Sequence, residues 1–172
     1  EMDEENRVLD IKQYGERRIN QPMSMDMFIM RKELLVDLIN ESISQGDSDF
    51  VKHCIIKNCG RLKMVGYHHA GYVGRIVSLQ SYFQHSMSLL NPNIWEELFF
   101  QSGYIYTKVK DEPPSKYMSS AQVTNSLLAG GCHIEGQVEN SILFRGVKVH
   151  KGAHIKNSII MQKGEIEAGA IL

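Results

Sequence analysis

The last third of the chain repeats itself, and this repeat limits the fold more than any other feature of the sequence. A shift of 17 residues places the stretch that starts at Val138 on the stretch that starts at Ile155. A fainter copy comes before both, because Asn125 and Ser126 lie 15 residues ahead of Asn140 and Ser141. The longer shift matches six pairs of residues, namely Val138 with Ile155, Asn140 with Asn157, Ser141 with Ser158, Ile142 with Ile159, Val149 with Ile166 and Gly152 with Gly169.

The spacing inside each copy identifies the kind of structure that repeats. An aliphatic residue recurs every four to six positions, with a small residue or glycine between, as in the stretch from Gly152 to Ile155. An amphipathic helix needs spacings of three and four, so this region is not helical. The pattern predicts hexapeptide repeats, in which three short strands form each coil, aliphatic side chains point inward, and Gly, Asn or Ser turns the corners. We therefore predict a left-handed parallel β-helix, a stack in which each coil buries its apolar edge on its neighbours.

Two kinds of apolar pattern alternate before the repeat. Residues that alternate between apolar and polar predict strands, and apolar residues at spacings of three and four predict helices. Strands that alternate with helices indicate an α/β layer. The expected strands cover 8–11, 25–31 and 61–67, and the expected helices cover 32–43, a short stretch from Phe50 to Gly60, and 79–90 with Ser78 as the cap.

A proline pair marks the boundary between the two kinds of sequence. Pro113 and Pro114 stand in an acidic and polar stretch where helical patterns end and the repeat begins. We expect an α/β domain over 1–112 and a β-helix domain over 113–172.

Composition narrows the functional classes. The apolar fraction of 42% is ordinary for a soluble protein, and a net charge of −1 gives no reason to expect nucleic acid or an anionic membrane as a partner. No apolar run approaches the twenty or so residues of a membrane span, and no signal peptide opens the chain. The three cysteines are odd in number and unpatterned, which favours a reducing, cytoplasmic setting.

Five strings in the same order resemble one enzyme family, the ADP-glucose pyrophosphorylases, also called glucose-1-phosphate adenylyltransferases. The strings are SMDMFIM for the family's SMGIYVF, DFVKH for DFGKD, GYVGRIVSLQSYF for GYWRDVGTIEAYY, PPSKY for PPAKF, and NSLLAGGCHIEG for NSLVSGGCVISG. The resemblance runs from about Met23 to the C-terminus. It implies the second half of a Rossmann-like nucleotidyltransferase domain followed by the β-helix.

The departures from the family pattern fall on one expected pocket. In the family, two carboxylates hold the Mg²⁺ that assists transfer of an adenylyl group from ATP to glucose 1-phosphate. One of these carboxylates falls on Arg75, whose guanidinium is always cationic and binds no metal. The family's Gly and Tyr fall on Asp26 and Phe28, and only Ser24 is kept in that string. The resemblance thus implies a vestigial sugar and metal pocket at Ser24, Asp26, Phe28 and Arg75, with no catalytic residue, metal ligand or cofactor in this chain.

Such losses resemble the GlgD-type subunit of bacterial glycogen biosynthesis. That resemblance implies a cytoplasmic regulatory or structural subunit that joins a catalytic ADP-glucose pyrophosphorylase subunit in a homo- or hetero-oligomer. Three alternatives remain. The chain belongs to a competent adenylyltransferase with a rebuilt site, or it is a hexapeptide acyltransferase that uses an outward-pointing histidine, His133, His150 or His154, as a general base. The third alternative is a pure assembly module that binds no ligand.

Two further groups of residues are candidates for binding. Arg145, Lys148, His150 and Lys151 form a basic stretch on the coils. The resemblance suggests that a regulatory anion binds there, whereas a solvated face is the default explanation. Histidine and cysteine pairs elsewhere, at 68–69 with His85 and at 53–54 with Cys59, lack the spacing of zinc sites.

The two ends of the sequence lack features that the family resemblance implies. No Gly-rich nucleotide loop precedes Met23, and Leu172 closes a hexapeptide without an atypical capping coil. We therefore expect the chain to be an internal part of a longer protein and, on its own, to self-associate through its uncovered sheet edge.

Overall fold

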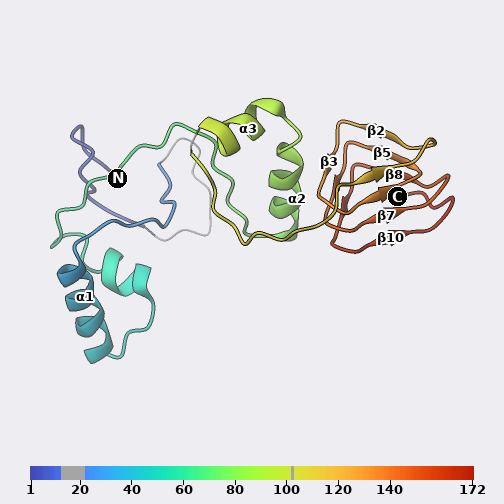
Figure 1. Ribbon diagram of the computed structural model, residues 1–172. Helices are drawn as coiled ribbons and strands as arrows, with labels where there is room; N and C mark the ends of the chain where they lie inside the picture. Colours follow the sequence, from blue (N-terminus) through green and yellow to red (C-terminus); the bar gives the residue numbers. More distant parts are fainter. Residues whose placement is uncertain (13–21, 102) are drawn as a thin grey trace. The chain divides into compact units, whose positions relative to one another are not determined.

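The computed structural model describes residues 1–12, 22–101 and 103–172. The chain divides into two compact units, Glu1–His69 and Ala70–Leu172, which are described separately below. Figure 1 shows helices in the first part of the chain and a stack of short strands in the last part.

Two helical segments form the centre of the first unit. The α-helix α1 spans Lys32–Ser44, and the π-helix η1 spans Phe50–Ile56. They pack through Leu38 of α1 and through Cys54 and Ile55 of η1, each only 2% exposed. Both helices predicted for this region are confirmed, although η1 ends at Ile56 and continues to Gly60 as a turn.

The strands predicted over 8–11, 25–31 and 61–67 are wrong as regular elements. Among the described residues, Val8 and Val65 form only isolated bridges, with Met2 and Arg7 respectively, and 25–31 contains no strand. The physical reason is that a strand exists only as part of a hydrogen-bonded ladder with a neighbour. Alternation in the sequence identifies an extended chain with two different faces, but it does not supply the neighbour.

The second unit begins with three short helical segments. They are α2 over Leu79–Ser88, α3 over Pro92–Glu96 and η2 over Glu97–Gln101. Ser78 caps α2 as predicted, because its side chain accepts the Ser81 N–H while the Ser81 side chain accepts the Ser78 N–H. Asn91 caps α3, because its side chain accepts the Asn93 N–H, and the proline that follows it occupies the first helical position.

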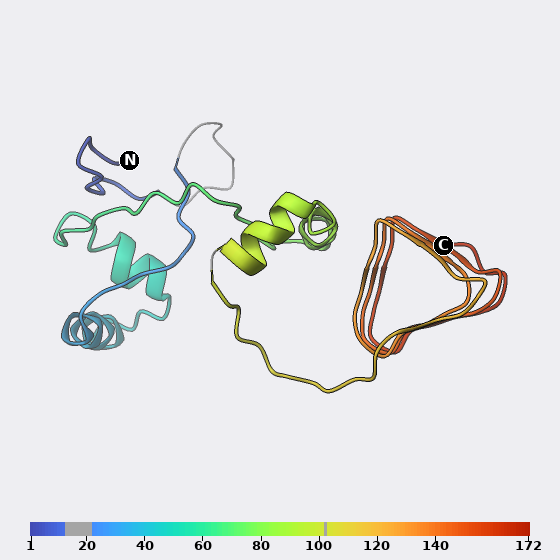
Figure 2. The same ribbon diagram turned by 45° about the horizontal axis from the view of Figure 1, so that its top comes forward.

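A parallel β-helix follows, and it confirms the predicted fold. Figure 2 shows the three-sided path of its coils. One sheet contains β1 (Lys116–Tyr117), β4 (His133–Ile134), β7 (Lys148–Val149) and β10 (Glu165–Ile166); the second contains β2 (Gln122–Thr124), β5 (Gln137–Glu139) and β8 (His154–Lys156); the third contains β3 (Leu127–Leu128), β6 (Ile142–Leu143) and β9 (Ile159–Ile160).

The strand register reproduces the repeat that the sequence displays. Val138 pairs with Ile155, Ile142 with Ile159, and Val149 with Ile166. The interior is filled by side chains from successive coils, and eight of them are at most 1% exposed: Cys132, Ile134, Val138, Leu143, Val147, Val149, Ala153 and Ile155. Burying these apolar side chains is the main source of stability for the stack.

Asparagine and serine turn one corner of every coil. Asn125, Asn140 and Asn157 have φ values of 43°, 46° and 50°, a left-handed conformation that asparagine tolerates better than most residues. Their amides form a ladder, since Asn125 Nδ2 donates to Asn140 Oδ1 at 2.9 Å and Asn140 Nδ2 donates to Asn157 Oδ1 at 2.6 Å. The next residue repeats this linkage, because the Ser141 N–H donates to Ser126 Oγ at 3.1 Å.

Candidate functional site

Three residues of the predicted vestigial pocket lie in the first unit. The Asp26 N–H donates to Ser24 Oγ at 3.0 Å, so the serine hydroxyl closes a local turn. Asp26 has a φ of 57°, in the left-handed region that glycine adopts without strain. This conformation agrees with the glycine that the resembled family places there. Phe28 packs edge-on against Phe50, with ring centroids 6.1 Å apart.

The fourth residue, Arg75, lies in the second unit directly after the loop Gly71–Gly74. Tyr72 fixes this loop, because its hydroxyl lies 2.9 Å from His85 Nδ1 and 2.6 Å from Ser88 Oγ. Its N–H also donates to Glu97 Oε1 at 2.5 Å. The loop therefore rests on α2 and on the start of η2, and the exposed Arg75 follows a firmly held turn.

The predicted basic stretch lies on the outside of the β-helix, where a carboxylate partly neutralises it. His150 Nε2 lies 2.8 Å from Glu165 Oε1, and Lys148 Nζ lies 3.8 Å from the same oxygen. The hydrogen bond from His150, followed by the charge of Lys148, lowers the pKa of Glu165 below its usual value. Arg145 is half-buried and Lys151 is exposed on the turns that flank β7. An anion bound at this face would compete with Glu165 for Lys148 and His150.

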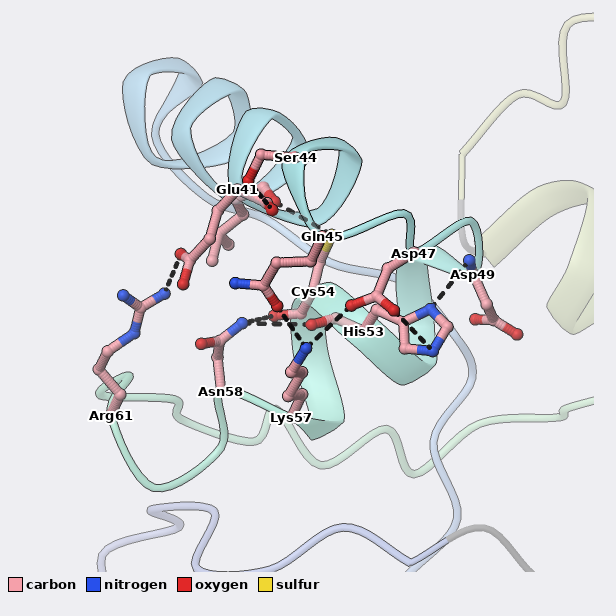
Figure 3. Close-up of polar contacts among 11 residues, drawn as sticks. Glu41, Ser44, Gln45, Asp47, Asp49, His53, Cys54, Lys57, Asn58 and Arg61 are labelled. Atoms are coloured by element: carbon pink, nitrogen blue, oxygen red, sulfur yellow. Dashed lines mark hydrogen bonds and ion pairs between the residues drawn. The ribbon is translucent and has the colours of Figure 1, made fainter.

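The structure reveals one polar cluster that the sequence did not single out, and we call it the hairpin cluster. It consists of Gln45, Asp47, Asp49, His53 and Lys57, which lie where α1 turns into η1 (Figure 3). Lys57 Nζ contacts Gln45 Oε1 at 2.5 Å and Asp47 Oδ2 at 2.9 Å. The hydrogen bond from Lys57 is the main cause that lowers the pKa of Asp47. The sequence places these five residues within the short span 45–57. It does not show the path of the loop between α1 and η1, which brings their side chains together.

Two neighbouring contacts brace the hairpin cluster. Arg61 pairs with Glu41 of α1 at 2.7 Å, and Asn58 Nδ2 donates to the carbonyl oxygens of His53 and Cys54. A small cavity of about 20 Å³ lies between α1 and η1, which is room for about one water molecule.

The part of the chain that the structure describes contains no group of three or more His, Cys, Asp or Glu residues placed to hold a metal ion. None of the helices in the described ranges is long and apolar enough to cross a membrane.

Comparison with known proteins first identifies the class of the β-helix domain. Residues 113–172 match the family described as "GlmU-like, C-terminal hexapeptide". This match agrees with the observed β-helix, so the chain carries a hexapeptide-repeat β-helix domain.

The particular relatives come from matches that extend beyond this domain. The chain is 44% identical over 133 residues to "Glycogen biosynthesis protein GlgD" of Bacillus subtilis (strain 168), covering 77% of the chain and 38% of that protein. The GlgD protein of Geobacillus stearothermophilus is 47% identical over 131 residues, covering 76% of the chain and 38% of the relative. A "Glucose-1-phosphate adenylyltransferase" of Clostridium botulinum (strain Eklund 17B / Type B) is 37% identical over 140 residues, covering 79% of the chain and 36% of the relative.

The chain is therefore a relative of GlgD and of the glucose-1-phosphate adenylyltransferases, which confirms the resemblance found in its sequence. It spans about two-fifths of the length of these relatives.

Proposed function

We propose that this chain belongs to a regulatory or structural subunit of glucose-1-phosphate adenylyltransferase in bacterial glycogen biosynthesis. The observation that supports this most directly is the sequence identity of 44% and 47% to two GlgD proteins, compared with 29% to 37% for adenylyltransferases of Fervidobacterium nodosum and Clostridium species.

The residue at position 75 supports the same proposal. A carboxylate that would bind Mg²⁺ in the resembled enzymes is replaced here by Arg75. Asp26 and Phe28 also depart from the pattern of the sugar pocket. A subunit with these residues contributes to catalysis through contact with an active partner, and the partner supplies the Mg²⁺ site. We accordingly assign no cofactor to this chain, and we place the complex in the cytoplasm.

The β-helix suits a role in assembly. Its coils are joined by backbone hydrogen bonds between strands, by the asparagine ladder and by a continuous interior of apolar side chains. Such a stack presents fixed outer faces, which a partner subunit recognises without paying much ordering entropy.

Co-expression of the full-length protein with the catalytic adenylyltransferase of the same organism tests the proposal. We expect the two proteins to co-purify and the mixture to form ADP-glucose from ATP and glucose 1-phosphate faster, or with a changed effector response, than the catalytic subunit alone. An Arg75→Gln variant serves as a matched control, because it removes the cation without creating a carboxylate and should leave co-purification unchanged.

The same assay addresses the second candidate function, a competent adenylyltransferase, which the 37% identity to the Clostridium botulinum enzyme favours. If the purified full-length protein alone formed ADP-glucose at a rate comparable with its catalytic relatives, the regulatory assignment would be wrong.

A further inference from the structure

We infer that His53 is a pH-sensitive cap at the start of η1, and that protonation of its ring removes the acceptor that holds the Asp49 N–H. This inference concerns a conformational device in the first unit and does not depend on the proposed function.

The geometry assigns the form of His53 that makes this cap. The Asp49 N–H donates to His53 Nδ1 at 3.1 Å, so Nδ1 carries a lone pair and the ring proton is on Nε2. In return, Asp49 Oδ1 accepts the Lys52 N–H at 2.9 Å. Asp49 and His53 thus satisfy two of the backbone N–H groups that a helix start leaves without a partner.

Protonation makes this contact impossible. An imidazolium carries a hydrogen on both ring nitrogens, so Nδ1–H would face the Asp49 N–H and two donors would meet. The Asp49 N–H then loses its acceptor, and the residues before it lose one of the contacts that hold them against η1.

The charged groups around the ring provide an alternative position for the imidazolium. Asp47 Oδ1 lies 3.6 Å from His53 Nε2, and Asp47 is also paired with Lys57. Lys52 lies on the same helix and opposes a positive ring, whereas Glu41 on α1 is occupied by Arg61. The charged ring therefore moves toward Asp47 and away from the Asp49 amide, as the arrangement in Figure 3 allows.

The aligned motif offers a comparison that isolates this effect. The string DFVKH ends in His53 where the resembled string DFGKD ends in aspartate. A carboxylate accepts an N–H at every pH between about 5 and 8. Histidine at this position thus replaces a carboxylate acceptor with an acceptor that is lost when its ring is protonated.

Amide hydrogen exchange of the ¹⁵N-labelled chain, followed by NMR at about pH 7.5 and about pH 5.5, tests the inference. After correction for the intrinsic exchange rate, the Asp49 amide should lose protection by about fivefold at the lower pH. The same amide should change by less than about twofold in His53→Gln and in His53→Asp, which keep an acceptor. Amides of the β-helix core, such as that of Val149, serve as an internal reference.

Three results would overturn the inference. They are equal protection of the Asp49 amide at both pH values, absence of protection already at the higher pH, and a parallel loss in His53→Gln. The last result would assign the pH response to a group other than His53.

Discussion

Asn140 shows why a single residue type recurs at one corner of the β-helix. Its left-handed backbone would suit glycine, which other corners use at Gly146 and Gly152. Asparagine adds a side chain that reaches both neighbouring coils, because it accepts from Asn125 and donates to Asn157. The repeat in the sequence located these corners, but it did not reveal the ladder, since spacing gives the position of an amide and not the direction in which it points.

Two substitutions of Asn140 separate the two contributions. Asn140→Gly keeps the easy left-handed backbone but removes both ladder hydrogen bonds, so it should lower the free energy of unfolding by about 1 to 2 kcal/mol. Asn140→Ala also places a β-carbon in the left-handed conformation and should cost about 1 kcal/mol more. Urea unfolding followed by circular dichroism measures both values. Equal stability of the two variants would show that the backbone conformation is not the deciding factor.

Gly136 allows one coil to be two residues shorter than its neighbours, with a register shift of 15 residues in place of 17. A β-carbon at Gly136 would lie 2.4 Å from the Ala153 oxygen and 2.8 Å from the His150 oxygen, and both are backbone atoms with little room to move. Gly136→Ala should therefore destabilise the β-helix by about 1 to 3 kcal/mol. Gly60→Ala is the control, because nothing lies within 4 Å of its added carbon. An equal effect of the two substitutions on the unfolding midpoint would contradict the crowding argument.

At the scale of elements, the sequence predicted the helices and caps that depend on residues nearby in the chain. It did not predict correctly the strands that depend on a hydrogen-bonded partner elsewhere in the chain. The helix α1 and the Ser78 cap follow from residues within one or two turns, and both are confirmed. The strands expected over 25–31 and 61–67 need a hydrogen-bonded partner, which alternation alone does not specify. The β-helix strands were predictable because each coil of the repeat is itself the partner of the next.

Glu165 provides a prediction about the contact between two neighbouring coils. It lies in β10 and pairs with Lys148 of β7 and with His150, which follows β7. Its pKa is lowered in the folded state, so the folded state binds a proton less readily than the unfolded state. Ionised Glu165 therefore stabilises the folded state at pH values above 4.5, its ordinary pKa. This stabilisation is lost as the pH falls through the lower pKa that Glu165 has in the folded state. The melting temperature of the native protein should exceed that of Glu165→Gln at about pH 6, and the gap should narrow as the pH falls below the ordinary pKa of 4.5.

Glu167→Gln is the matched control for this pH series, because Glu167 lies two residues further along and outside the ion pair with Lys148 and His150. Its melting temperature should follow that of the native protein at every pH. If Glu167→Gln reproduced the full effect of Glu165→Gln, the loss would reflect the overall charge of the β-helix and not this specific contact.

At the scale of the whole molecule, the proposed regulatory role raises the question of whether Arg75 alone would account for a loss of activity. Restoring it with Arg75→Asp in the full-length protein should not restore ADP-glucose formation, because Asp26 and Phe28 still stand where the family has Gly and Tyr. We expect turnover to stay at least about a thousandfold below that of a catalytic relative, since several interactions with the transition state are missing together. A combined variant with Asp26→Gly, Phe28→Tyr and Arg75→Asp should form ADP-glucose faster than Arg75→Asp alone. The measurement is the rate of ADP-glucose formation with Mg²⁺, ATP and glucose 1-phosphate. Strong turnover by Arg75→Asp alone would contradict the prediction, because it would mean that the sugar pocket is intact and that Arg75 by itself prevents the reaction.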